Sequence, residues 1–257
     1  MAKVDLIHGD CMTELQKLED KSIDLILCDL PYGTTACKWD SVLDLTVLWQ
    51  EYKRVLKENG VVLLFGQEPF SSIVRTSNLS WYRYDWVWRK NKPSNFQLMN
   101  YQPGRIHENI MVFSEGKACY TEKGNNMPYT PQLEKRDKVR RANARIYVKE
   151  GKEQAPLLHN YVGNRENIKT YEYRQPVTIL EFPNEPHKVH PTQKPVALLK
   201  YLIRTYSKEG DIVLDNCMGS GSTGVASVNT NRGFIGIEKD EKYFSVAKER
   251  LGIVLRA

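Results

Sequence analysis

Short apolar runs alternate along the chain with longer stretches in which apolar residues recur at helical spacing. The apolar runs have the length of strands and lie at residues 5–7, 23–28, 61–65, 82–89, 109–113, 211–215 and 233–238. The stretches with helical spacing lie at 12–18, 42–56, 69–75, 196–206, 222–229 and 241–251. This alternation is typical of an α/β protein. We therefore expect a sheet of about seven strands with helices between most of them.

The alternation breaks down between residues 115 and 185. Apolar periodicity fades there, while Asn, Pro, Gly, Tyr and charged residues become more frequent. A solvated, mobile insertion is one explanation, but a long irregular segment inside a compact domain is usually either functional or disordered. The pattern predicts one domain built from two halves, residues 1–114 and 186–257, with an inserted region at 115–185.

Composition excludes several classes of protein. The chain has 257 residues, of which 41% are hydrophobic and 26% charged, close to the average of soluble globular domains. Its longest apolar runs are strand-sized and its first residues enter a strand pattern directly, so we expect neither a membrane span nor a signal peptide. The five cysteines show no metal-ligand spacing. This favours a reduced, cytoplasmic protein without a metal site.

The net charge of +6 permits a nucleic-acid partner without requiring one. The excess is not spread evenly, because residues 134–174 contain eleven Lys or Arg against six Asp or Glu. A solvated surface is the competing explanation for this charge. Most of the positive excess therefore lies in the segment that breaks the α/β pattern.

A glycine-rich loop, Gly219-x-Gly221-x-x-Gly224, follows the apolar run that ends at Asp215. Glycines let the backbone approach a ligand, and the helix that follows offers free N–H groups, although a tight turn or a nicotinamide dinucleotide site would use the same pattern. Glu238 ends the next apolar run, where a carboxylate can accept hydrogen bonds from a ribose. Asp215 would repel a pyrophosphate but suits a cationic amino-acid group. These features favour S-adenosylmethionine (AdoMet) over a nicotinamide cofactor.

The turn Asp29-Leu30-Pro31-Tyr32 follows the apolar run that ends at Cys28. Asp-x-Pro is also an ordinary turn sequence. In an open parallel sheet, however, ligands bind outside the carboxyl ends of the strands. A carboxylate and a backbone carbonyl there can accept hydrogen bonds from an exocyclic amine, and Tyr32 offers a face on which a planar base can stack. Two acceptors on the amine hydrogens would localise its lone pair and make it a better nucleophile.

In these motifs the chain resembles the amino-group DNA methyltransferases, which methylate adenine N6 or cytosine N4 with AdoMet. The segments that carry the resemblance are Asp29 to Tyr32, Asp215 to Gly221, His190-Pro191-Thr192-Gln193-Lys194-Pro195, Ile7 to Asp10 and His107 to Phe113. The catalytic motif precedes the cofactor motif, as in the β class of the family. The resemblance implies a seven-stranded, mostly parallel sheet of the Rossmann-like AdoMet-dependent methyltransferase type with an inserted target-recognition lobe. Leu30 departs from the family pattern, which usually has proline there.

The resemblance also implies roles for individual residues. The catalytic turn would be Asp29, Leu30, Pro31 and Tyr32. The cofactor would contact Asp10, Thr192, Lys194, Asp215, Cys217, Gly219, Ser220, Gly221, Thr223 and Glu238. Asp10 has an alternative role as the N-cap of the short helix that follows it.

A stacked base cannot reach such a turn, so base flipping from double-stranded DNA is implied. We expect phosphate contacts from Arg89, Lys90, Lys92 and Arg105. The stretch from Arg136 to Lys152 is the expected target-recognition surface, with Arg136, Arg140 and Arg141. The aromatic residues that alternate from Trp81 to Trp88 fit a hydrophobic core better than a platform for bases.

These features together predict direct transfer of a methyl group from AdoMet to a flipped base. Asp29, as the first residue of the turn, favours adenine N6 over cytosine N4. None of the cysteines follows a proline, the position that carbon-5 methylation of cytosine requires for its nucleophile. An RNA or protein-amide methyltransferase, a DNA-binding module without activity and a nicotinamide-dependent oxidoreductase are the alternatives. A homodimer is one assembly that the resemblance allows.

Overall fold

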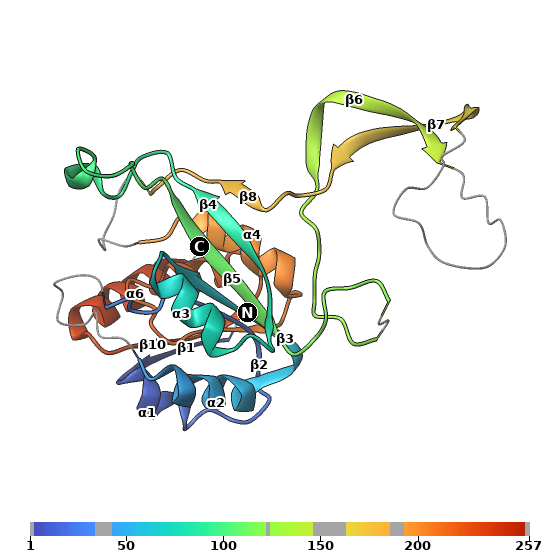
Figure 1. Cartoon of the computed structure of the whole chain (residues 1–257). Coiled ribbons are helices and arrows are strands. Elements are labelled where there is room, and N and C mark those ends of the chain that lie inside the picture. Colours follow the sequence, from blue (N-terminus) through green and yellow to red (C-terminus); the bar gives the residue numbers. More distant parts are fainter. Residues whose placement is uncertain (1–2, 34–42, 122–123, 146–162, 186–192, 255–257) are drawn as a thin grey trace. The chain divides into compact units, whose positions relative to one another are not determined.

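The computed structural model describes residues 3–33, 43–121, 124–145, 163–185 and 193–254 (Figure 1). The chain divides into two compact units, one formed by Met1–Thr130 with Val177–Ala257 and the other by Pro131–Pro176. The first unit holds the central sheet and all of the described helices. None of the described helices is both long and apolar enough to cross a membrane.

The central sheet contains eight strands in the order β1-β10-β9-β2-β3-β5-β4-β8. Their bounds are β1 (Val4–His8), β2 (Ile23–Cys28), β3 (Leu56–Gly66), β4 (Tyr82–Arg89), β5 (His107–Ser114), β8 (Ile179–Glu181), β9 (Ile212–Asp215) and β10 (Gly233–Glu238). The strands from β1 to β3 in this order are parallel to one another, β5 is antiparallel to both of its neighbours, and β8 is parallel to β4. The α/β class and the mostly parallel sheet are confirmed.

The predicted count of seven strands is wrong by one. The additional strand, β8, has only three residues and lies at the edge of the sheet beside β4. Of these residues only Leu180 is buried, where it packs in the same core cluster as Trp86 and Trp88. A strand with a single buried side chain is too short to show an alternating pattern, so it cannot be recognised from its own residues.

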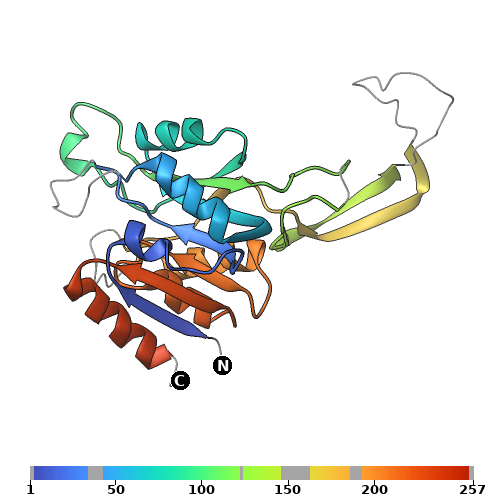
Figure 2. The same cartoon turned by 90° about the horizontal axis from the view of Figure 1, so that it is seen from below.

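Helices cover both faces of the sheet (Figures 1 and 2). They are α1 (Cys11–Leu15), α2 (Leu45–Val55), α3 (Phe70–Ser77), α4 (Val196–Tyr206), α5 (Ser222–Val228) and α6 (Glu241–Val254). Residues of α1, α2 and α3 form one core cluster with the sheet, and residues of α4, α5 and α6 form the other. In β2, Leu25 and Leu27 face the second cluster, while Ile26 and Cys28 face the first. This alternation explains why β2 is apolar on both faces.

The same edge of the sheet receives the ends of several strands. Because β2, β9 and β10 are parallel and in register, their carboxyl ends meet there and bring Asp29, Asp215 and Glu238 to one side of the molecule. β5 runs the other way, and the pairing of Gly66 with Asn109 places the beginning of β5 at this edge as well. The residues before Asn109 therefore lie near the turn that follows β2.

The second unit is an antiparallel ribbon of two long strands, β6 (Glu134–Arg145) and β7 (Gly163–Arg174). It lies within the segment 115–185 predicted as an insertion. Residues on either side of it belong to the first unit. Before the ribbon, Met127 is buried in the main core and the backbone N–H of Thr130 donates to the carbonyl of Thr205 at 2.7 Å; after it, Leu180 is buried in the same core. The compact inserted unit is thus shorter than the irregular segment of sequence.

We expect Phe113→Ala to lower the free energy of unfolding by about 3–5 kcal/mol, because the Phe113 ring is fully buried in β5 and packs against Trp49 with 4.9 Å between the ring centroids. Phe96→Ala is the matched control. Its ring is 69% exposed, so the same substitution should change the stability by less than about 0.5 kcal/mol. Urea unfolding of both variants measures the difference. Equal losses in the two variants would contradict the assignment of Phe113 to the core.

Candidate active site

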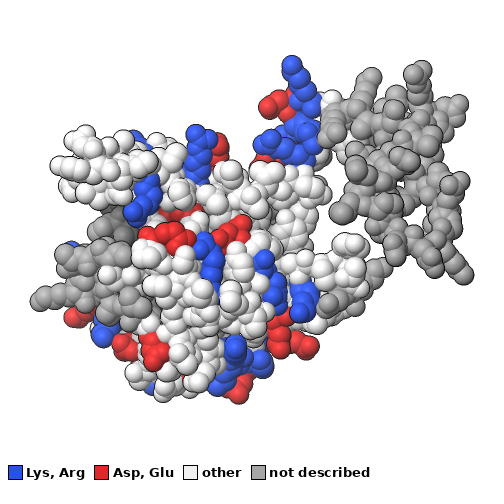
Figure 3. Space-filling model, viewed as in Figure 1, with Lys and Arg blue, Asp and Glu red and all other residues white. Residues whose placement is uncertain are grey.

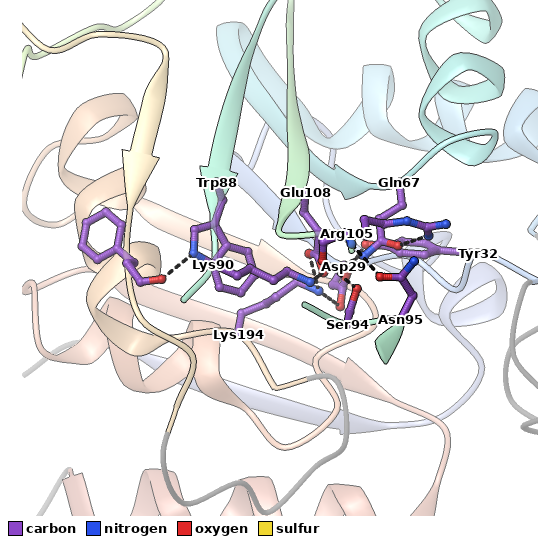
Figure 4. A network of polar contacts seen from close by, with 11 residues as sticks. Asp29, Tyr32, Gln67, Trp88, Lys90, Ser94, Asn95, Arg105, Glu108 and Lys194 are labelled. Atoms are coloured by element: carbon purple, nitrogen blue, oxygen red, sulfur yellow. Dashed lines mark hydrogen bonds and ion pairs between the residues drawn. The ribbon is translucent and has the colours of Figure 1, made fainter. Parts of the chain in front are cut away.

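The turn after β2 holds a carboxylate whose two oxygens both accept hydrogen bonds. The hydroxyl of Tyr32 donates to Oδ1 of Asp29 at 2.6 Å, and the ammonium of Lys194 donates to Oδ2, also at 2.6 Å (Figure 4). The Tyr32 ring stacks on Phe70, with the ring centroids 4.8 Å apart and an angle of 27° between the planes. Leu30 is buried and anchors the turn in the core of the sheet. The carboxylate and the aromatic ring are therefore fixed side by side.

Asp29 is the first member of a row of alternating charges. The ammonium of Lys194 lies 2.6 Å from Asp29 and 3.2 Å from Oε2 of Glu108. The second oxygen of Glu108 is paired with Lys90. The side chains of Lys194, Glu108 and Lys90 are each less than one-tenth exposed. The row crosses from the turn after β2 to the start of β5 and the end of β4 (Figure 4).

The pKa values of these groups follow from burial and from their neighbours. Burial alone would raise the pKa of Glu108, but Lys194 and Lys90 outweigh it and lower that pKa to about 2. Burial raises the pKa of Asp29, which Lys194 opposes and Glu108 reinforces. Burial would lower the pKa of Lys194, yet the two carboxylates raise it. Lys194 and Glu108 are therefore charged at neutral pH.

A cleft of about 210 Å³ opens beside this row, lined by Gly66, Gln67, Glu68, Arg105, His107, Glu108 and Asn109. The amide nitrogen of Gln67 donates to Oε1 of Glu108 at 3.0 Å, and the guanidinium of Arg105 donates to the amide oxygen of Gln67 at 2.5 Å. Its lining combines donors and acceptors from β3, β5 and the segment that joins β4 to β5. Hydrogen-bonding groups set in a partly apolar lining suit a planar ligand with hydrogen-bonding edges.

The glycine-rich loop turns tightly between β9 and α5. Gly219 and Gly221 have positive φ angles of 52° and 76°, a conformation that favours glycine. A Cβ atom on Gly221 would lie 2.9 Å from the Cβ of Ala247. The backbone N–H of Gly219 donates to Oε2 of Glu238 at 2.8 Å. The end of β10 thus holds the loop in place.

Two acidic groups flank this loop. Burial raises the pKa of Asp215 to about 6, although hydrogen bonds from Thr223 and from the backbone N–H of Cys217 oppose the shift. Burial also raises the pKa of Glu238, whose oxygens accept from the N–H groups of Gly219 and Asp240. A buried carboxylate behind the loop and a second one beside it are the groups that an ammonium and a ribose diol, respectively, would contact. The residues present therefore fit AdoMet.

Comparison with known proteins identifies the family. A DNA methylase family model matches residues 23–249. The chain belongs to this DNA methylase family. It is 29% identical to the DNA adenine methyltransferase YhdJ of Escherichia coli (strain K12), over 96% of this chain and 82% of that protein. It is 30% identical to the type II methyltransferase M.HpaI of Haemophilus parainfluenzae, over 96% of this chain and 73% of that protein.

Solved structures share the fold of this DNA methylase. The M1.HpyAVI–SAM complex aligns with a TM-score of 0.60 at 24% identity and covers 96% of this chain and 100% of its own. The cytosine-N4-specific PvuII DNA methyltransferase aligns with a TM-score of 0.65 at 13% identity and covers 100% of this chain and 92% of its own. At these identities the likeness supports the fold of the methylase.

The structure places most of the predicted cofactor residues around the glycine loop and two of them elsewhere. Asp10 caps α1, accepting from the N–H of Met12 at 3.1 Å, and also pairs with Lys239 at 3.1 Å. The alternative role of Asp10 as an N-cap is thus confirmed. The ammonium of Lys194 instead pairs with Asp29 in the turn after β2. Thr192 falls outside the described residues.

Of the remaining cofactor residues, Asp215 ends β9 and Glu238 ends β10, and the others lie in the loop or in the helix that follows it. The hydroxyl and the carbonyl of Ser220 both accept hydrogen bonds from Arg250 of α6. Cys217 is half-buried, and Thr223 is buried at the start of α5. Gly219 and Gly221 form the turn itself. Contacts of these residues with the cofactor stay predictions.

The predicted phosphate-binding residues differ in their exposure and in their partners. Lys92 is exposed and Arg89 forms an exposed ion pair with Glu181. Arg105 donates to Gln67 beside the cleft. Lys90 is at odds with the prediction, because its ammonium is buried and paired with Glu108 and does not face solvent. The sequence carried no sign of this burial, because Lys90 stands among other cations and its partner Glu108 is distant in the chain.

The residues predicted for target recognition lie in the second unit. Arg136 donates from Nε to the carbonyl of Tyr173 at 3.3 Å, across the ribbon. Arg140 and Arg141 are in β6. Their contact with DNA stays a prediction.

Sequence reasoning assigned no role to Glu108 or Gln67. Glu108 stands at the start of a strand that is otherwise apolar from Ile110 to Phe113. A charged residue next to a buried run is the signal that could have identified it, because an ionised side chain is rarely buried without a partner.

We expect Gly221→Ala to destabilise the methylase more than Gly210→Ala. Both glycines have positive φ angles, 76° and 88°, so alanine costs about 1–2 kcal/mol at either site. At Gly210 nothing lies within 4 Å of the added Cβ, whereas at Gly221 the new atom meets Ala247 at 2.9 Å. Overpacking should add about 1–3 kcal/mol at Gly221 alone. Urea unfolding tests this difference, and equal losses at the two sites would contradict the tight packing of the loop.

Proposed function

We propose that this methylase transfers a methyl group from AdoMet to the N6 amine of adenine in double-stranded DNA. The observation that carries the proposal is the meeting of two motifs at one sheet edge. The turn with Asp29 and Tyr32 follows β2, and the glycine loop follows β9, the strand that pairs with β2. A base amine and a cofactor methyl group can approach each other there. The adenine assignment is supported by Asp29 and by the likeness to a DNA adenine methyltransferase over 96% of this chain.

The catalytic turn prepares the amine for attack. The carboxylate of Asp29 and the backbone carbonyl of Leu30 or Pro31 accept hydrogen bonds from the two amine hydrogens. Both oxygens of Asp29 already have one donor each, but a carboxylate oxygen has a second lone pair that can accept from the amine. The amine lone pair is then localised on nitrogen and directed away from the ring.

Tyr32 supplies the face on which the base is held. Its ring is fixed on one side by stacking on Phe70 and at its hydroxyl by Asp29. Stacking of a base on a tyrosine that is already ordered costs little conformational entropy. Holding the two reactants in line can supply a large part of the rate enhancement, because the reaction then becomes effectively unimolecular.

The other groups at the sheet edge would hold the cofactor, which supplies an electrophilic methyl group on a sulfonium when bound. Glu238 would accept hydrogen bonds from the ribose hydroxyls with the lone pairs that Gly219 and Asp240 leave free. Asp215 lies behind the loop, where it suits the ammonium of the amino-acid end. The chain itself would supply no nucleophile in this scheme: the base amine would take the methyl group from the sulfonium, leaving a neutral thioether, and the proton that the methylated amine then loses would pass to the Asp29 carboxylate or to water.

Two surfaces carry features suited to DNA, the loop between β4 and β5 in the first unit and, taken by itself, the ribbon of the second unit. The loop exposes Lys92 next to the large apolar side chains Phe96 and Tyr101, which are 69% and 88% exposed. In the ribbon, Lys135 and Lys138 are exposed. Figure 3 shows Lys and Arg side chains interspersed with Asp and Glu on one face of the molecule. Cations for phosphates and exposed aromatic rings for unpaired bases are the combination that duplex opening requires. A homodimer stays a prediction.

Methylation of DNA with isotopically labelled AdoMet, followed by nucleoside mass spectrometry, tests the proposal. We expect N6-methyladenine, and N4-methylcytosine would overturn the choice of base. Asp29→Asn should lower the transfer rate by about 100-fold or more, because it removes the charge that faces the amine, while leaving AdoMet affinity unchanged. Asp24→Asn is the matched control at the opposite end of β2, where Asp24 forms a partly exposed ion pair with Lys57. Equal activity of the two variants would contradict the role of Asp29.

The salt dependence of DNA binding tests the proposed surface. We expect Lys92→Ala to weaken DNA binding and to reduce the slope of log K against log salt by about 1, the value for one phosphate contact. Charge reversal of both Arg140 and Arg141 to Glu should have a larger effect in the same direction. Lys57→Ala removes a cation from the opposite end of the sheet and should leave the slope unchanged. Unaltered slopes in the first two variants would mean that DNA lies elsewhere.

A further inference from the structure

Glu108 is a buried carboxylate that the proposed reaction does not use directly. Its side chain is 7% exposed. Oε1 accepts from Lys90 and from the amide of Gln67, the latter at 3.0 Å. Oε2 is buried and faces the ammonium of Lys194 at 3.2 Å. The Glu108 carboxylate is therefore fixed by three side chains, one of which, Lys194, also contacts Asp29.

Lys194 is shared between two carboxylates. Its ammonium lies 2.6 Å from Asp29 and 3.2 Å from Glu108, and it stands over the ring of Phe65 at 5.0 Å. The two carboxylates compete for one cation, so the attraction that Glu108 exerts on Lys194 reduces the share that Asp29 receives. Lys90 provides a second cation on the far side of Glu108 and keeps this carboxylate ionised.

The strength of Asp29 as an acceptor depends on this competition. A carboxylate fully neutralised by a single lysine is a weaker partner for the hydrogens of an amine that gains positive charge during attack. A carboxylate that shares its lysine keeps more of its own negative charge.

We propose that Glu108 is a positioning residue that acts through Lys194, holding the ammonium between two carboxylates so that Asp29 remains a strong acceptor for the target amine. This inference rests on the proposed function. Gln67 contributes by fixing the orientation of Glu108, since its amide bridges the carboxylate and the guanidinium of Arg105 (Figure 4). The loop between β4 and β5 is thereby connected to the catalytic turn.

The proposal predicts that substitutions of Glu108 and of Lys194 shift the pKa of Asp29 in opposite directions. The titratable groups that face Asp29 are Tyr32, Lys194, Glu108, Lys90, Cys28 and Asp215. Among them Glu108 raises the pKa of Asp29 and Lys194 lowers it. Removing the charge of Glu108 should therefore lower this pKa, and removing the charge of Lys194 should raise it.

The experiment measures single-turnover methyl transfer against pH at saturating AdoMet and DNA. In Glu108→Gln we expect the rate at neutral pH to fall about tenfold, equivalent to about 1.4 kcal/mol in the barrier, and the acid limb to move to lower pH. In Lys194→Met the acid limb should move to higher pH. Glu108→Asp keeps the charge and should retain the wild-type acid limb.

Glu51→Gln is the matched control, because Glu51 forms its ion pair with Arg54 in α2, away from the site. It should match the wild type in both rate and pH profile. A fall in the rate of Glu108→Gln without any movement of the acid limb would overturn the proposal and leave Glu108 a purely structural role. Thermal unfolding identifies a variant that fails to fold. If Glu108→Gln does so, the acid limbs of Glu108→Asp and Lys194→Met test the proposal instead.

A second readout separates this inference from the proposed function. The carbon-13 shift of the Asp29 carboxyl, followed across pH in the free protein, reports its pKa without any turnover. We expect a lower pKa in Glu108→Gln and a higher one in Lys194→Met. If the wild type methylates no DNA, the proposed function fails. If the pKa of Asp29 is the same in both variants and in the wild type, the inference about Glu108 fails whether or not DNA is methylated.

Discussion

The ion pair between Lys194 and Asp29 joins parts of the chain that are far apart in sequence. Lys194 precedes α4, while Asp29 follows β2, and their atoms meet at 2.6 Å in a buried site. Removing two charges from water is costly, and the attraction between them compensates only when further partners complete the arrangement. Glu108 and Lys90 are those partners. The turn after β2 is therefore held by a row of alternating charges whose members depend on one another.

The change of strand direction within the sheet makes this row possible. From β1 to β3 the strands are parallel, and their carboxyl ends carry the acidic residues of the site. β5 is antiparallel to β3, so the site receives the beginning of this strand and with it Glu108. A parallel strand at the same place would present its other end. The reversal thus brings Glu108, at the beginning of β5, to the edge where the other acidic residues stand at the ends of parallel strands.

The cofactor side of the site is organised in a different way. There the backbone shapes the site, through two glycines with positive φ angles and an N–H that donates to Glu238. The catalytic side relies on charged side chains and the cofactor side on a tight loop. This division suits the proposed chemistry, in which a neutral base amine has to be polarised while a cofactor has to be held closely by main-chain groups and carboxylates.

The sequence by itself determined the α/β class, the positions of the Asp29–Tyr32 turn and the glycine loop, and the family, because periodicity and turn composition depend on residues that are neighbours in the chain. Only the tertiary structure decided that Lys90 is buried, that Lys194 contacts Asp29, and that Glu108 lies between them. It also decided that Ile179–Glu181 adds an eighth strand. These features depend on the register and direction of strands that are distant in sequence. No local pattern encodes which lysine a buried carboxylate meets, because that choice is made when the sheet assembles.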